Sequence, residues 1–507
     1  MAKILRLSFS QDIYTLDPQK SCDPFSSAAI FLLFKGLTRL EANHKIACDI
    51  ADSIQISQDC KTYTFHLGRH FWSDGTPITA FDFEKSWKRA LHPNFPIRSL
   101  DFFYQIKNAE KAKKKLLPLD AIGIYVKNPN ILIVELENAC PHFLELTCFC
   151  PLFPLPSHAK ENAPEAICSG PFQLEKWSKG REVLLRKNIF CHSISPVTID
   201  GIHIQIIPDE KEAFALFEKG GLDWIGDPIS PLPLNHLPSL VQTRKIKPVA
   251  GVVSCYFNTL QFPFHNLNLR KAFSYAISRE KVLNTLLLHN VFSASGPIPP
   301  ILKQNTTSPF PDDAADYAKE LFRAGLQELG IPASRLKITL TLETTDLHCR
   351  LAKLLQATWE KVFEIQIQLE PLPFKVLFER LPKREFQLAI NRWLAQYTDP
   401  INILEKFESR DSQKNYTGWE NFKYKAILKR YRKTALHDKR MELASQAEEL
   451  LMQHMPIAPI YYHYHSYLQK PYLKNLAISP IGVVQFDRVS LDQEQSSLED
   501  PLQTQVL

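Results

Sequence analysis

The sequence lacks the short motifs that mark the common catalytic and phosphate-binding sites. It contains no H-E-x-x-H, no G-x-S-x-G and no adjacent Gly-Lys pair, so the signatures of zincin proteases, α/β-hydrolases and P-loop proteins are absent. No C-x-x-C occurs among its ten cysteines, although zinc knuckles normally use such close pairs. We therefore predict no enzymatic activity, no metal site and no cofactor.

Long apolar runs and a strong charge of one sign are missing as well. The apolar stretch at residues 28–34 ends at Lys35, far short of the ~20 residues that span a bilayer. The net charge is only +6 over 507 residues, with Lys and Arg spread along the chain, so we predict no nucleic-acid partner. Residues 4–9 alternate like a strand directly after Met1, so no signal peptide is visible. Either the protein is cytosolic or a targeting segment has been removed.

The cysteines and histidines leave alternatives open. Cys140, Cys148, Cys150 and Cys168 lie close together in the sequence. One or two disulfides in an oxidising compartment, or buried free thiols, fit this spacing equally. The i,i+2 histidines at 463 and 465 fall on one face of a strand and could hold a metal, but a polar strand edge is the preferred interpretation.

The length and the hydrophobic periodicity predict the fold class. A chain of 507 residues exceeds the size at which single cores stop growing, so two or more lobes are expected. Period-two alternation predicts strands at 61–67 and 202–206, with a denser apolar strand at 130–137. Helical patterns occur at 80–90, 210–219, 269–289, 314–329, 351–362 and 439–454. We predict an α/β protein with sheets covered by helices, and a disordered polar tail over 492–507.

One segment carries a specific resemblance. Residues 71–83 read FWSDGTPITAFDF, which places an Asp-Gly turn after a strand and a Thr cap before a helix. This run resembles the signature of the family-5 solute-binding proteins, the oligopeptide- and dipeptide-binding receptors of ABC importers. Further matches follow in order at 15–18 (TLDP), 169–172 (SGPF), 256–258 (YFN), 269–273 (LRKAF), 276–280 (AISRE), 397–400 (YTDP) and 459–462 (PIYY). The resemblance extends from about residue 13 to 470.

The resemblance implies a two-lobed periplasmic-binding-protein fold with the ligand cleft between the lobes. Lobe I is expected to comprise residues 1–248 and 471–507, with an inserted subdomain at about 41–168, and lobe II residues 249–470. Such a receptor captures a short peptide in an extended conformation as the lobes close. It then delivers the peptide to ABC permease and ATPase subunits in the membrane. We expect a monomer in the periplasm or another extracytoplasmic compartment, with its signal peptide removed.

A departure from the family pattern lies at the expected anchor for the ligand's amino group. The family places an Asp in a W-x-A-D-Y segment, whereas this chain reads WLAQY over residues 393–397 and has Gln396 at that position. A neutral amide binds an ammonium group more weakly than a carboxylate does. Either another carboxylate replaces the anchor, with Asp23 as the candidate, or the ligand is an unusual peptide. A γ-linked tripeptide resembling glutathione and a cell-wall peptide are examples of the second case.

Other residues near these two positions complete the candidate binding set. Arg392 could bind a ligand carboxylate through a bidentate fork or form a surface ion pair. Trp393 and Tyr397 could line the pocket or belong to the core, and Cys22 beside Asp23 could contact a thiol ligand or be inert. Asp399, in the same segment, is the last member of the set. A Cys–His hydrolase and a receptor for metal or haem complexes are the alternative functions.

Overall fold

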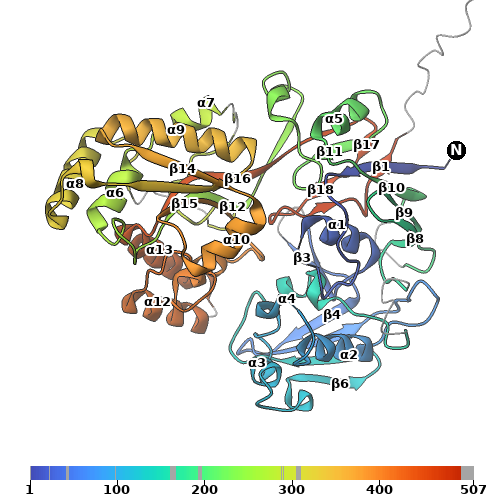
Figure 1. Cartoon of the computed structure of the whole chain (residues 1–507). Coiled ribbons are helices and arrows are strands. Elements are labelled where there is room, and N and C mark those ends of the chain that lie inside the picture. The colour runs from blue at the N-terminus through green and yellow to red at the C-terminus, as the bar shows by residue number, and fades with distance from the viewer. Residues whose placement is uncertain are drawn as a thin grey trace, which may run out of the picture.

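The structure, a computed structural model, describes residues 2–21, 23–41, 45–97, 99–159, 167–191, 197–286, 288, 291–303, 310–434 and 436–492. Within these residues the chain forms two lobes that are linked by long strands (Figure 1). The predicted α/β class and two-lobed architecture are therefore confirmed. Cys22 and residues 493–507 of the expected tail lie outside the described residues.

A ten-stranded sheet runs through both lobes. Its strands, in spatial order, are β14 (Ile367–Leu372), β13 (Ile338–Glu343), β15 (Leu388–Leu394), β12 (Lys245–Phe257), β16 (Ile457–Gln469), β11 (Trp224–Gly226), β1 (Ile4–Phe9), β10 (Gly201–Ile206), β9 (Glu182–Lys187) and β8 (Phe172–Ser178). The first five strands build lobe II and the last five build lobe I. β12 and β16 pair with each other along most of their length, and they connect the lobes.

Lobe I includes a separate subdomain with its own sheet. That sheet has the order β4 (Ala51–Ile56), β5 (Thr62–Leu67), β7 (Ile131–Glu135) and β6 (Ile124–Asn128). The helices of lobe I are α1 (Pro24–Leu33), α2 (Ala80–Leu91), α3 (Ala109–Lys113), α4 (Phe143–Leu146) and α5 (Glu210–Glu218). Short strand pairs are formed by β2 (Thr38–Leu40) with β3 (Ile46–Cys48), β17 (Leu473–Lys474) with β20 (Ser490–Leu491), and β18 (Ala477–Ile478) with β19 (Val484–Gln485).

In lobe II, helices cover both faces of the sheet. They are α6 (Leu267–Tyr275), α7 (Arg279–Thr285), α8 (Ala315–Leu329), α9 (Asp346–Phe363), α10 (Phe374–Lys383), α11 (Ile401–Leu404), α12 (Phe422–Lys433) and α13 (His437–His454). Buried residues of α6 to α9 pack with Val253 and Tyr461 of the sheet. Buried residues of α10 to α13 pack with Val252 and Trp393 in a second cluster. Consecutive residues of a strand thus face different layers, as the pleat requires.

The motif at residues 71–83 forms a turn and a helix cap, as its sequence predicts. Gly75 has a φ of +82°, a left-handed conformation that favours glycine. Asp82, which is buried, accepts hydrogen bonds from the Thr79 N–H (2.7 Å) and from the Ser157 N–H (2.8 Å). One carboxylate therefore begins α2 and also holds a distant segment of the inserted subdomain.

One local prediction was wrong. The pattern at 269–289 forms two helices, α6 and α7, because the carbonyls of Tyr275 and Ile277 accept hydrogen bonds from the N–H groups of Ala314 and Asp313 instead of continuing the helix. The histidines at 463 and 465 lie on β16 before the three residues, 467–469, at which it pairs with β11, and His465 is buried. Hydrophobic periodicity indicates which residues are buried, but it does not indicate which distant backbone groups end a helix by accepting or donating its hydrogen bonds.

All nine cysteines within the described ranges are free thiols. Of the two interpretations left open by the sequence, the structure shows buried thiols at Cys140, Cys148, Cys150 and Cys168. Burial raises the pKa of the Cys255 thiol to about 12. Buried, protonated thiols of this kind behave as small apolar side chains.

We predict that Asp82→Ala lowers the free energy of unfolding by about 2–3 kcal/mol, because two backbone donors in the protein interior lose their acceptor. The matched control is Asp120→Ala, since the side chain of Asp120 is 92% exposed and surface changes usually stay within about 0.5 kcal/mol. Urea unfolding followed by circular dichroism measures both. Equal effects of the two substitutions would show that the Asp82 cap does not stabilise the fold.

Candidate ligand-binding site between the lobes

One strand of lobe II has an edge without a partner. β15 pairs with β12 from Leu388 to Leu394. On its other edge it pairs with β13 only at Leu388 and Ala389. Within the described residues, positions 390–394 therefore have no strand neighbour on that edge. Such an edge presents backbone N–H and C=O groups that an extended peptide can pair with.

Arg392 and Trp393 on this strand point to opposite faces of the sheet. Arg392 lies opposite Val253, whereas Trp393 lies opposite Val252, and Val253 and Val252 belong to different core clusters. The structure therefore does not bring the two predicted site residues together. Their separation follows from the period of two along a strand.

Trp393 is a buried residue. It packs in the cluster that contains α10 to α13, and the Lys406 ammonium group lies 4.6 Å from the centre of its ring. Burial lowers the pKa of Lys406 well below its ordinary value. The indole thus contributes to the core and packs against the end of the Lys406 side chain.

Arg392 is exposed and lies among titratable groups at the junction of the lobes. Burial raises the pKa of Asp227 to about 6, against the opposing charge of Arg392. Burial, together with the positive charge of Arg392, lowers the pKa of His465 to about 3 and lowers that of His463 well below its usual range. Both histidines are therefore neutral at neutral pH, and Arg392 is a cation in this group.

The segment after β15, residues 396–400, is here called the anchor loop. Gln396 is exposed, Thr398 is half-buried and the other three residues are buried. The Gln396 N–H donates to Oδ1 of Asn402 (3.1 Å), which fixes the backbone at this position. The loop therefore presents the Gln396 amide from a held backbone.

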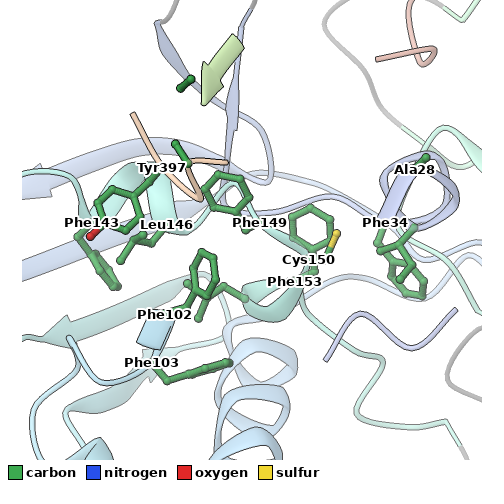
Figure 2. Packing of buried hydrophobic residues seen from close by; sticks show 14 of the residues in the cluster. Ala28, Phe34, Phe102, Phe103, Phe143, Leu146, Phe149, Cys150, Phe153 and Tyr397 are labelled. Atoms are coloured by element: carbon green, nitrogen blue, oxygen red, sulfur yellow. The ribbon is translucent and has the colours of Figure 1, made fainter. Parts of the chain in front are cut away.

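Tyr397 and Asp399 fix this loop rather than face solvent. Tyr397 lies among Phe143, Leu146 and Phe149 of the inserted subdomain (Figure 2). Asp399 Oδ1 accepts from the Tyr431 hydroxyl (2.5 Å) and from the Ile401 N–H (2.9 Å). Its Oδ2 lies 3.5 Å from Nη2 of Arg440. Because protein groups engage both of its oxygens, Asp399 has a structural role and is not part of the proposed binding set.

Asp23 caps a helix. Its Oδ1 accepts from the Ser26 N–H (2.7 Å) at the start of α1. Its Oδ2 is buried and has no hydrogen-bond partner among the described residues. Oδ1 is thus engaged in the helix cap and Oδ2 is covered by protein, and the thiol of Cys22 lies outside the described residues.

Two aromatic residues of α10 were missed in the sequence. Phe374 is 60% exposed and Phe378 is 53% exposed, and their rings lie 5.3 Å apart. Leu377 and Leu381 on the same helix are buried. Figure 1 shows α10 on the side of lobe II that is turned toward lobe I. The four-residue spacing of the two phenylalanines was visible in the sequence. With an apolar pair beside them, however, that pattern is typical of buried core residues.

The structure contains one arrangement that resembles a nucleophile and its base. Sγ of Cys140 lies 3.2 Å from Nε2 of His142, and Nδ1 of His142 lies 3.9 Å from Asp399 Oδ2. Burial raises the pKa of the Cys140 thiol well above its ordinary value and lowers that of His142. A buried, protonated thiol is not an activated nucleophile, so the contact is structural.

No group of three or more His, Cys, Asp or Glu side chains within the described ranges is arranged to hold a metal ion. In the same part of the chain, none of the helices combines the length and the apolar character needed to cross a membrane.

We predict that Asp399→Ala lowers the free energy of unfolding by about 3–5 kcal/mol, because it leaves Arg440 and Tyr431 without their buried partner. Gln396→Ala, in the same loop but exposed, should change it by no more than about 0.5 kcal/mol. Guanidinium unfolding of the two variants gives the comparison. A small loss for Asp399→Ala would show that this carboxylate does not hold the loop.

Comparison with known proteins shows the family to which the chain is similar. Residues 45–415 match the model of the bacterial extracellular solute-binding proteins, family 5. The oligopeptide-binding protein OppA of Bacillus subtilis is 32% identical, with 95% of this chain and 91% of the relative covered. The periplasmic murein peptide-binding protein MppA of Escherichia coli is 25% identical, with 94% and 90% covered.

Solved structures agree with this placement at the level of fold. The Escherichia coli murein tripeptide-binding protein MppA superposes with a TM-score of 0.83 at 23% identity, with 97% of this chain and 98% of that chain covered. The family match extends over more than half of the chain, and the relative from Bacillus subtilis is aligned along nearly its whole length. The chain therefore belongs to the bacterial extracellular solute-binding proteins of family 5.

Proposed function

We propose that the protein is the peptide-capturing receptor of an ABC importer. The observation that carries this proposal is the unpaired edge of β15 at residues 390–394, beside the exposed Gln396. An extended peptide laid along this edge forms main-chain hydrogen bonds that do not depend on its sequence. Phe374 and Phe378 add exposed apolar surface on α10, a helix on the side of lobe II that is turned toward lobe I (Figure 1).

Charged and neutral groups near this edge define how the ends of the ligand are bound. Arg392 is the exposed cation in this group and is suited to a ligand carboxylate. Gln396 presents a neutral amide where the family resemblance expects a carboxylate. The preferred ligand is therefore a short peptide whose amino end is modified or linked in an unusual way, such as a glutathione-like or cell-wall peptide. One relative is named for a murein peptide, which supports the second class.

The second candidate is a receptor for ordinary oligopeptides in which Asp23 replaces the missing anchor. The names of relatives such as OppA and the dipeptide-binding protein DppE of Bacillus subtilis favour ordinary peptides. The position of Asp23 favours the first candidate, because one of its oxygens caps α1 and the other is buried. A ligand would have to displace this helix cap to reach the carboxylate.

Transport requires a compartment and partners outside this chain. We place the protein outside the cytoplasm, in keeping with its family of extracellular solute-binding proteins. Its partners are the permease and ATPase subunits that move the captured peptide across the membrane. We propose that it acts as a monomer.

Native mass spectrometry of the purified protein tests the function directly. We expect a bound species with the mass of a short peptide, released intact on denaturation. Cleavage of added peptides by the purified protein would overturn the receptor proposal, as would a tightly bound non-peptide ligand.

In small-angle scattering, the radius of gyration should fall when the identified peptide is added, because the lobes close around it.

We predict that Gln396→Asp strengthens binding of tri-alanine with a free amino group by about tenfold, since a charge-assisted hydrogen bond replaces a neutral one. Titration calorimetry measures the change. N-acetylated tri-alanine is the matched ligand, and its affinity should not rise because it carries no ammonium group. Gln396→Asn is the matched variant. An equal gain for both peptides would place Gln396 away from the amino end.

A further inference from the structure

The anchor loop of lobe II is held by the inserted subdomain of lobe I. The carboxylate of Glu145, in α4, accepts a hydrogen bond from the Thr398 N–H. One turn earlier, the ring of His142 stacks on Tyr397, with ring centres 4.7 Å apart and planes 2° from parallel. Figure 2 shows Tyr397 beside Phe143 and Leu146 of α4. Both contacts join segments about 250 residues apart, and both reach residues next to Gln396.

Glu145 is in an unfavourable position for a carboxylate. Its exposed fraction is only 3%, and no cation lies within ion-pair distance of it in the part of the chain that the structure describes. Burial raises its pKa to about 7, a rise that the hydrogen bond from Thr398 opposes and that nearby Asp399 increases. A buried acid without a cation costs stability, and an apolar side chain of similar size is often more stable.

The groups packed around Glu145 do not neutralise it. Thr38, Thr147 and Cys148 on the side of α4 form hydrogen bonds among themselves, and the negative charge of Glu145 helps to raise the pKa of the Cys148 thiol. On the side of the anchor loop, the charged groups are Asp399 and its partner Arg440, with His142 and Glu405 close to Tyr397. The strong contact that Glu145 makes is therefore the one to the backbone of Thr398.

We infer that Glu145 is a positioning residue for ligand binding: it fixes the backbone of the anchor loop from the other lobe and thereby sets where the Gln396 side chain meets the ligand. This inference rests on the proposed function, because it assumes that Gln396 faces a peptide. Gln396 has its own backbone restraint from Asn402, so Thr398 is the second fixed point of the same loop. Two fixed points on either side of Tyr397 leave the exposed amide little freedom.

The titration of Glu145 gives this role a measurable signature. Its folded-state pKa of about 7 lies above the ordinary value of 4.5, because burial favours the protonated acid more than the hydrogen bond from Thr398 favours the carboxylate. The associated stabilisation is complete below pH 4.5 and is lost as the pH rises through about 7. Ionisation above pH 7 thus costs the fold stability, but it makes the bond to the Thr398 N–H charge-assisted and therefore stronger at pH 8 than at pH 5.5. The order of the anchor loop should follow this bond.

Hydrogen–deuterium exchange tests the contact separately from ligand binding. In Glu145→Ala, we expect the backbone amides of residues 396–399 to exchange at least about tenfold faster than in the wild type, which matches the loss of one buried hydrogen bond. Glu145→Gln keeps an acceptor and should restore protection. Unchanged exchange in Glu145→Ala would overturn the inference, whether or not the protein binds peptides.

Calorimetry with tri-alanine at pH 5.5 and pH 8 tests the effect on the ligand. We expect the wild type to bind more tightly at pH 8 than Glu145→Gln does, because its carboxylate is then ionised. Glu145→Ala should bind about tenfold more weakly than Glu145→Gln at both pH values. Glu110→Gln, an exposed acid of the same subdomain, is the control and should follow the wild type. Faster exchange in Glu145→Ala without weaker binding would show that the contact holds the loop but does not position the ligand.

The comparison remains informative if Glu145→Ala fails to fold. Glu145→Gln and the wild type then differ only in the charge that develops above pH 7, and identical pH profiles of affinity for the two proteins would overturn the inference. If the wild type binds no tri-alanine at either pH, the proposed peptide function fails in its ordinary form, while the exchange experiment still decides whether Glu145 holds the loop.

Discussion

The pairing of β12 with β16 is the constraint on which the arrangement of the lobes depends. These strands connect the halves of the ten-stranded sheet, and their ladder shifts register between Pro248 and Val252. Gly251 lies in this irregularity, where a Cβ atom would come within 2.9 Å of the Cβ of His463 and within 2.6 Å of a methyl group of Leu394. A bulge in a ladder is a natural place for two strands to bend. The lobes are thus joined by a strand pair whose ladder is irregular here and again between Val253 and Ser254, next to the unpaired edge of β15.

The two lobes are also in contact away from these strands. The contacts of Glu145 and His142 with the anchor loop join the inserted subdomain to lobe II, and Arg350 of lobe II donates to Asn235 of lobe I (2.9 Å). Closure of the lobes therefore involves contacts at more than one place. The residues that present Gln396 belong to lobe II in sequence, but they are packed partly by lobe I.

Local sequence predicted much of the fold and less of the site. The capping residue Thr79 identified the start of α2, and most of the long helices follow from periodicity. The split between α6 and α7 was not predicted, because its cause is a hydrogen-bonding partner near residue 314. Adjacent positions 392 and 393 were placed in one pocket, although strand geometry separates them. The contact between residues 145 and 398 could not be inferred, since nothing in either segment specifies the other.

The incomplete pairing of β15 also bears on how the protein behaves at high concentration. An open strand edge can pair with the same edge of a second molecule, which is a common route to edge-to-edge aggregation. Arg392 lies in the middle of this unpaired stretch and is exposed. A charge at that point repels an identical edge, because two copies would bring like charges together as they pair. The exposed arginine in the unpaired stretch of β15 therefore disfavours edge-to-edge pairing of two molecules.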